Sequence, residues 1–232
     1  MIISHEHKFI FLKTRKTGST STELFLFPHC GAEDIITPLT STALTRSVGH
    51  HAQKHIRPAF ALDPRPWINR FWQLEGARSI DYHDHIRAQA VRSYVGEEIW
   101  RSYYKFAFDR NIYDRQVSWF HYKTRKAADK KRWPDFKTFL QSSPKAVVDN
   151  FQIYSIGGEL AVDFMGRYET LREDLGKVLQ TLGLPGTGEL PHAKGEFRPE
   201  GRPAYRDYYD SDTRALVESW YPGELKLFHD SF

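Results

Sequence analysis

The sequence predicts an α/β fold in which helices cover a mainly parallel sheet. Residues 8–12 are a short, continuously apolar segment with the character of a strand buried on both faces, and residues 104–108 are a second candidate for a buried strand. Residues 162–168 are predicted to form a third strand. A stretch with helical periodicity follows each of these segments. Because strands that alternate with helices usually pair in parallel, this order of elements favours the α/β class.

The first strand, "KFIFL" at residues 8–12, leads through a hydroxyl-rich turn into a helix over residues 19–27. Residues 31–82 are rich in proline and carry scattered aromatic and charged side chains, so we expect them to be irregular. We interpret them as an excursion from a single domain spanning residues 1–232. The sequence leaves open whether this excursion forms a lid over a site.

Helical signals return at Asp84 and end at Gly96, a favourable helix stop. The second strand, at residues 104–108, continues into a basic amphipathic helix over residues 113–126.

Further helices are predicted towards the C-terminus. Pro134 opens a helix that runs through Phe139. After the strand at 162–168, a leucine-rich stripe predicts a helix that ends at Gly183, and Asp210 or Ser211 caps a last helix.

Composition restricts the class of protein. The chain has 232 residues, of which 40% are hydrophobic, enough for a sizeable core. No apolar run approaches the ~18 residues that cross a bilayer, and the first residues lack the features of a signal peptide.

Cys30 is the one cysteine, which excludes an intrachain disulfide, fits a reducing compartment and leads us to expect a cytoplasmic protein. The net charge of +4 favours anionic ligands, although a role in solubility explains it equally well.

The turn after the first strand has the composition of an anion site. A strand that enters a helix through a glycine-containing turn directs backbone N–H groups at one point, where the helix N-terminus adds partial positive charge. The turn supplies one further cation and several hydroxyls: Lys16, Thr17, Gly18, Ser19, Thr20 and Ser21. Lys16 precedes Gly18, so the triphosphate-binding pattern Gly-x-x-x-x-Gly-Lys-Ser/Thr is not met. An ordinary capped helix after a polar turn is the alternative interpretation.

A second corner has the same design. "FAFDRNIYDRQVSWF" also runs from strand to helix, with Arg110 at the exit of the strand and Ser118 eight residues later. Because the carboxyl ends of parallel strands meet at one edge of a sheet, both corners are expected at that edge. Two anion sites there suit a ligand with a phosphate at each end.

Both corners resemble motifs of one enzyme family. "FIFLKTRKTGSTSTE" resembles the 5′-phosphosulfate loop of sulfotransferases that use 3′-phosphoadenosine 5′-phosphosulfate (PAPS), and "FAFDRNIYDRQVSWF" is similar to their 3′-phosphate segment. "VDFMGRYETLREDL", "LPHAK" and "YRDYYDSDTRALVESWY" resemble segments of the carbohydrate branch, sulfotransferase family 2. Arg15 stands where the loop usually has proline, and Ile112 where the second motif usually reads Asn-Pro.

The resemblance implies a three-layer fold related to the P-loop nucleotide hydrolases. It also implies PAPS as donor, 3′-phosphoadenosine 5′-phosphate (PAP) as product, and no metal requirement. Lys16 would touch the phosphosulfate and stabilise the bridging oxygen, while residues 17–21 would wrap the 5′-phosphate. Arg110 and Ser118 would hold the 3′-phosphate. Two roles are left open for Arg115: a structural salt bridge and a contact with the ligand.

Transfer to a hydroxyl also needs a base, and a nearby histidine or carboxylate is suited to accept the proton. "HDHIRAQAVRSYVGEEIW" resembles the segment in which a histidine acts as general base in this branch, and His85 falls on that position. His83 and His51 are the next candidates, and Glu75 is a weaker one. A cysteine or a histidine–glutamate pattern that would complete a metal site at His83 and His85 is missing, so no metal is expected.

The residues themselves do not identify the acceptor. Trp67, Arg70, Trp72 and Arg78 have the chemistry to bind a sugar, but anchoring a long loop explains them equally well. A glycan hydroxyl is implied by the resemblance alone.

Two other functions compete with the sulfotransferase interpretation. A nucleotide-triphosphate-dependent kinase requires the triphosphate-binding pattern that is missing. A non-catalytic module that binds anions or nucleic acid requires a continuous basic stripe with exposed aromatic residues, and only residues 122–132 come close. We therefore expect no nucleic-acid partner and no membrane span, and the oligomeric state stays open.

Overall fold

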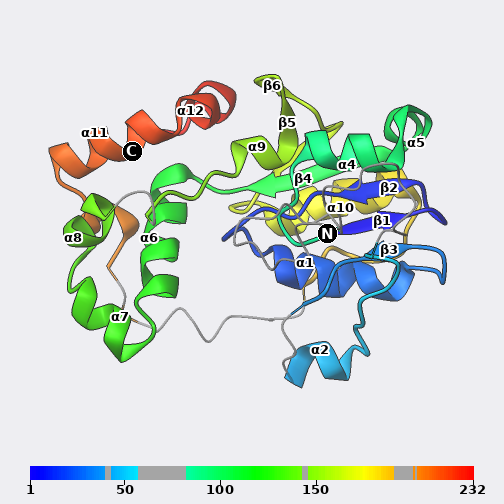
Figure 1. Ribbon diagram of the computed structural model, residues 1–232, viewed down its shortest axis with the longest axis horizontal. Coiled ribbons are helices and arrows are strands. Elements are labelled where there is room, and N and C mark those ends of the chain that lie inside the picture. The colour runs from blue at the N-terminus through cyan, green and yellow to red at the C-terminus, as the bar shows by residue number, and fades with distance from the viewer. Residues whose placement is uncertain (40–42, 57–81, 143–145, 191–200, 202) are drawn as a thin grey trace, which may run out of the picture.

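The computed structural model describes residues 1–39, 43–56, 82–142, 146–190, 201 and 203–232. Its central feature is a five-stranded sheet in the order β3-β1-β2-β4-β7, seen in Figure 1. The strands are β1 (Ile2–Ser4), β2 (Phe9–Phe11), β3 (Ile35–Ile36), β4 (Tyr104–Asp109) and β7 (Phe164–Arg167). β2, β4 and β7 pair in parallel, whereas β1 runs antiparallel to both of its neighbours. The mainly parallel sheet and its three predicted strands are therefore confirmed.

Two strands were not predicted. β1 and β3 are three and two residues long, too short for a period-two pattern to stand out from the sequence. β3 and the short helix α2 (Ala43–Ser47) belong to residues 31–82, so the expectation of an irregular segment is wrong for that part. Residues 57–81 lie outside the described residues.

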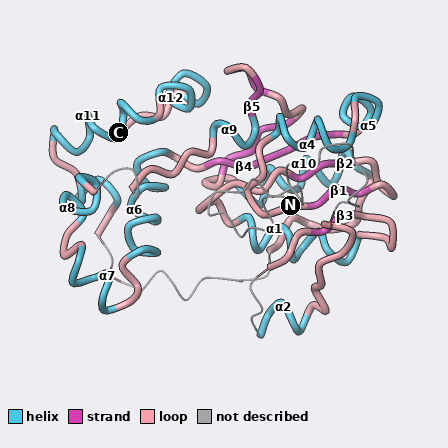
Figure 2. Tube along the Cα trace, viewed as in Figure 1, coloured by secondary structure: helices cyan, strands magenta, loops and turns pink. Residues whose placement is uncertain are grey.

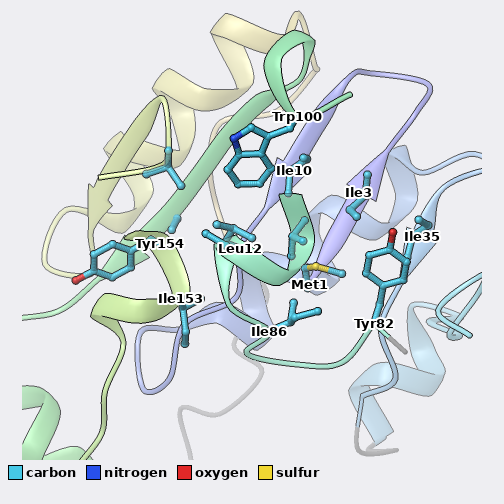
Figure 3. Close-up of a cluster of buried hydrophobic side chains, with 14 residues drawn as sticks. Met1, Ile3, Ile10, Leu12, Ile35, Tyr82, Ile86, Trp100, Ile153 and Tyr154 are labelled. Carbon is cyan, nitrogen blue, oxygen red and sulfur yellow. The ribbon is translucent and has the colours of Figure 1, made fainter. Parts of the chain in front are cut away.

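Helices cover both faces of the sheet. Phe9, Phe11, Phe106 and Phe108 point to the face that packs against α1 (Ser19–Leu26) and α10 (Leu171–Leu182). On the other face, Ile10, Leu12 and Ala107 pack against α4 (Ala88–Val95), α5 (Glu97–Ser102) and α9 (Phe151–Tyr154). Figure 3 shows this second core, in which Leu12, Ile86, Ile153 and Tyr154 gather from separate segments. The sheet is thus the middle of three layers.

A separate group of helices packs around its own core. It includes α6 (Ile112–Lys123), α8 (Phe136–Gln141), α11 (Ser211–Trp220) and α12 (Pro222–Phe228), which share a cluster of buried aromatic and aliphatic side chains. Figure 2 shows α6, α7 (Ala127–Arg132), α8 and α11 on one side and the strands, in magenta, on the other. The remaining elements are η1 (Phe27–His29), β5 (Ser155–Ile156), β6 (Glu159–Leu160) and η3 (Tyr205–Tyr208).

The predicted helices are present, with shifted ends. α4 begins at Ala88 rather than near Asp84, because the backbone at His85 has a φ of 62° and cannot continue a helix. α8 begins after Asp135, whose side chain caps it by accepting from the Thr138 N–H, and not at Pro134. α10 ends at Gly183 in the left-handed conformation, as predicted. Asp210, not Ser211, caps α11.

The topology places two strand ends side by side. Phe9 pairs with Tyr104 and Phe11 with Phe106, so the carboxyl ends of β2 and β4 are adjacent. The loop into α1 and the corner into α6 therefore leave the sheet at the same edge. Among the described helices, none is long and apolar enough to cross a membrane.

Candidate functional site

The two strand-to-helix corners are in contact. Thr14, three residues after the end of β2, donates its hydroxyl proton to the backbone carbonyl of Phe108 in β4. Arg110 Nη1 lies 3.4 Å from the carbonyl oxygen of Lys16, and donates to it. The proximity that parallel pairing implies is therefore present, and the residues of both corners share one edge of the sheet.

The loop before α1 is shaped by its own hydroxyls. Thr17 is fully buried, with its hydroxyl 2.7 Å from that of Thr14, and Ser19 donates to the Thr14 carbonyl at 2.7 Å. Lys16 and Gly18 both have a positive φ, 65° and 72°, a conformation that lysine rarely adopts. Such strain is characteristic of ligand-binding turns.

The first turn of α1 has the properties of an anion site. Gly18 is the N-cap and contributes no side-chain cap, so the first N–H groups of the helix keep their capacity to bind an anion. Thr20 and Ser21 lie half-buried in this turn. The hydroxyls of Thr17 and Ser19 support the loop from within.

The two lysines of the loop region differ in environment. Lys13 is buried and forms ion pairs with Glu23 at 2.8 Å and Asp84 at 2.7 Å. Lys16 is half-buried, and its Nζ lies 4.6 Å from the centre of the Tyr122 ring in α6. Lys13 is therefore held by carboxylates, whereas Lys16 lies against α6.

Arg110 and Ser118 border the same region. Arg110 is buried, donates from Nε to Asp114 at 2.8 Å and stacks 4.3 Å above the Tyr168 ring. Asp114, Ser118 and Tyr122 follow one another at four-residue spacing, so they lie on one face of α6. Because Arg110 and Lys16 contact the two ends of this stripe, the half-buried Ser118 faces the loop between them.

Arg115 and Asp109 have a structural role. Arg115 is fully buried, and its Nη1 lies 2.8 Å from one carboxylate oxygen of Asp109, while its Nη2 lies 3.0 Å from Glu224. Asp109 also accepts from the hydroxyl of Tyr154 at 2.8 Å. Of the two alternatives for Arg115, the structure therefore supports the salt bridge, and the carboxylate of Asp109 is occupied by buried partners.

The sequence did not indicate Asn150, which connects both corners. Its side chain accepts from the Arg15 N–H at 2.9 Å and donates to the Arg15 carbonyl at 3.0 Å and to Asp109 at 3.0 Å. The one available signal was an asparagine directly before a short apolar helix. Asn150 fixes the loop relative to the exit of β4.

His85 is held in the form that a general base requires. Its Nδ1 lies 2.8 Å from the carbonyl oxygen of Lys13, which can only accept, so Nδ1 carries the proton and Nε2 presents its lone pair. Burial lowers the pKa of His85 to about 4, against the opposing effect of the bond to Lys13. The imidazole is therefore neutral at neutral pH.

A cavity of about 430 Å³ lies beside His85. Its volume is within the ~300–1,000 Å³ range of small-molecule sites. Its walls come from the loop, from the segment before α4, from α6 and from the start of α9. The lining residues are Arg15, His85, Arg87, Trp119, Val147, Val148, Asp149, Gln152 and Ile153.

The other predicted candidates lie elsewhere. His83 is exposed and bonds through Nδ1 to the Asp84 carbonyl, and His51 contacts the ring of Phe27, beyond the far end of α1 from the loop. Within the described residues no cluster of histidine, cysteine, aspartate or glutamate is arranged to hold a metal. Glu75, Trp67, Arg70, Trp72 and Arg78, together with the segment "LPHAK" after Leu190, lie outside the described residues.

Comparison with known proteins identifies relatives of the chain. Residues 1–229 match the model of a family described as "Sulfotransferase family". An uncharacterized protein of Archaeoglobus fulgidus is 35% identical over 101 residues, which cover 42% of this chain and 82% of that protein. No solved structure matches the chain.

Proposed function

The chain belongs to the sulfotransferase family, and from this premise we propose that it transfers a sulfuryl group from PAPS to an acceptor hydroxyl. The observation that carries the proposal is the contact between the two corners, Arg110 Nη1 to the Lys16 carbonyl at 3.4 Å. This contact supports the proposal that the loop would bind the 5′ side, and Arg110 the 3′ side, of one doubly phosphorylated nucleotide. We propose a P-loop-like fold on the same basis.

Two groups of residues would hold the donor. Lys16 and the first turn of α1, residues 17–21, would bind the 5′-phosphosulfate through N–H groups, hydroxyls and one cation. Arg110 and Ser118 would bind the 3′-phosphate. Arg110 pairs with Asp114 in this structure, so a bound phosphate would share its donors with that carboxylate.

Transfer would proceed in line. The acceptor oxygen forms a bond to sulfur while the bond from sulfur to the bridging phosphate oxygen breaks, and PAP leaves with the electron pair. Lys16 would stabilise the negative charge that develops on the bridging oxygen. Nε2 of His85 would take the proton of the acceptor hydroxyl, which suits a neutral imidazole held by the Lys13 carbonyl. This scheme needs no metal.

Three finer points belong to the proposal. The acceptor would be a carbohydrate, as the resemblance to the carbohydrate branch implies. The chain would form a single domain over residues 1–232, supported by the family match over residues 1–229. It would work in the cytoplasm, since Cys30 is its one cysteine and a reducing compartment suits a free thiol.

The test measures transfer of label from [³⁵S]PAPS to a panel of saccharides in the presence of EDTA. We expect transfer with the wild-type chain and severe loss with Lys16→Ala and Arg110→Ala. A thermal-shift titration with PAP, and with ATP and magnesium, accompanies it. Stabilisation by ATP with magnesium and none by PAP would contradict the proposal and favour a kinase.

A further inference from the structure

The cavity beside His85 contains positive charge that the proposed transfer step does not use. Arg15 and Arg87 both line it, one from the loop and the other from the segment before α4. Arg15 Nη1 lies 3.5 Å from the backbone carbonyl oxygen of Asp149. In the part of the chain that the structure describes, neither arginine has a carboxylate within 4.0 Å of its guanidinium.

The local electrostatics favour a further anion in this cavity. Burial lowers the pKa of Arg15, the carboxylate of Asp149 opposes this effect, and the positive charge of Arg87 adds to it. Arginine nevertheless stays protonated in proteins, so Arg15 keeps its charge in a half-buried position near the exposed Arg87. The carboxylates of Asp149 and Asp84 both act on Arg15 from a distance. Since neither is an ion-pair partner of Arg15 or Arg87, an acidic group on a ligand would supply the direct pairing.

The backbone contacts of position 15 exclude the proline that is usual in this loop. The sulfotransferase loop usually has proline there, but here the Arg15 N–H donates to Asn150 at 2.9 Å, a bond that proline cannot make. Asn150 donates back to the Arg15 carbonyl at 3.0 Å. The backbone of Arg15 is thus fixed on both sides while its side chain lines the cavity.

We propose that Arg15, together with Arg87, determines acceptor specificity by binding an acidic group next to the hydroxyl that receives the sulfuryl group. This inference rests on the proposed function. A carboxylate and a phosphate or sulfate ester share the oxyanion chemistry that a guanidinium binds through two parallel hydrogen bonds. Trp119 lines the same wall, with its ring stacked on that of Tyr122.

The experiment compares two saccharides that differ only in charge. The probes are a tetrasaccharide of alternating glucuronic acid and N-acetylglucosamine and the same tetrasaccharide with its carboxylates reduced to alcohols. Binding of each is measured by calorimetry with PAP present, so that turnover is not needed. A second pair, glucose 6-phosphate and glucose, distinguishes an ester from a carboxylate.

We expect the wild-type chain to bind the acidic member of at least one pair about tenfold or more tightly than the neutral member. Arg15→Gln and Arg87→Gln should each remove most of that preference and leave PAP affinity unchanged. Arg101→Gln is the matched control, because Arg101 is 78% exposed in α5, which precedes β4 at the opposite edge of the sheet.

Two results would overturn the inference. One is equal or undetectable binding of both members of each pair by a wild-type chain that binds PAP. The other is an Arg15→Gln variant that loses PAP affinity as well, since that would assign Arg15 to the donor. Failure of the wild-type chain to bind PAP at all would instead contradict the proposed function.

Discussion

The carbonyl oxygen of Lys13 lies 2.8 Å from Nδ1 of His85, so a residue just beyond β2 holds an imidazole 72 positions away in the sequence. The side chain of the same lysine forms an ion pair with the neighbouring Asp84 at 2.7 Å. Two bonds from one residue therefore fix the segment that carries Asp84 and His85 beside the loop. Because His85 has a positive φ, this anchoring also maintains an unfavourable backbone conformation.

The pH dependence of turnover should reflect the low pKa of His85. A base must be unprotonated, and burial lowers this pKa from 6.5 to about 4. The rate should therefore not fall near pH 6.5, where an ordinary histidine titrates, but only as the pH approaches about 4. The measurement is kcat against pH with a saturating acceptor, and loss of rate near the ordinary pKa would contradict the account.

Substitution of histidines should separate His85 from its neighbour. His85→Ala should lower kcat and leave PAP affinity unchanged, whereas His83→Ala, at an exposed position, should change neither. Full turnover by His85→Ala with an established acceptor would remove His85 from the mechanism.

The two lysines should respond differently to the same change. Lys13→Met removes a partner of the buried carboxylate of Glu23 and of the half-buried carboxylate of Asp84, so we expect the free energy of unfolding to fall by about 3 kcal/mol. Lys16→Met should change stability little and reduce kcat by roughly 100-fold, because it removes the cation at the developing charge. Chemical denaturation and label transfer measure the two effects. An unstable Lys16→Met variant with normal turnover would contradict the assignment.

Gly18 should tolerate no side chain. Its φ is 72°, and an added Cβ would lie 2.9 Å from the Cδ2 atom of Leu171. We expect Gly18→Ala to lower the free energy of unfolding by about 2 kcal/mol or more and to weaken PAP binding. Gly157→Ala is the control, because its φ is 63° but its added Cβ would meet nothing within 4 Å. An equal loss of unfolding free energy in the Gly18→Ala and Gly157→Ala variants would show that packing against Leu171 is unimportant.

Much of the fold was predictable because its central strands are continuous apolar runs followed by helical periodicity. β2, β4 and β7 are such runs, and Gly183 is an unambiguous end of α10. β1 and β3 lack enough residues for any periodicity, and the start of α4 depends on a turn held by Lys13, a contact that no local pattern encodes.

The sequence predicted those parts of the candidate site that lie at the ends of neighbouring parallel strands. Parallel pairing of β2 with β4 is sufficient to bring Lys16 and Arg110 together. Asn150 and Arg87 come from segments far along the chain, and their positions depend on how α9 and the segment before α4 pack on the sheet. The cavity that His85, Arg15 and Trp119 line is likewise a product of tertiary packing.

The most direct test of the two-corner donor site is calorimetric titration, without magnesium, of PAP and of adenosine 5′-monophosphate, which lacks the 3′-phosphate. The wild-type chain should bind PAP far more tightly than the monophosphate. Arg110→Ala should remove most of that difference by weakening PAP alone, because Arg110 would contact only the 3′-phosphate. Equal affinity of the wild-type chain for both nucleotides, or an Arg110→Ala variant that weakens both alike, would contradict the central claim.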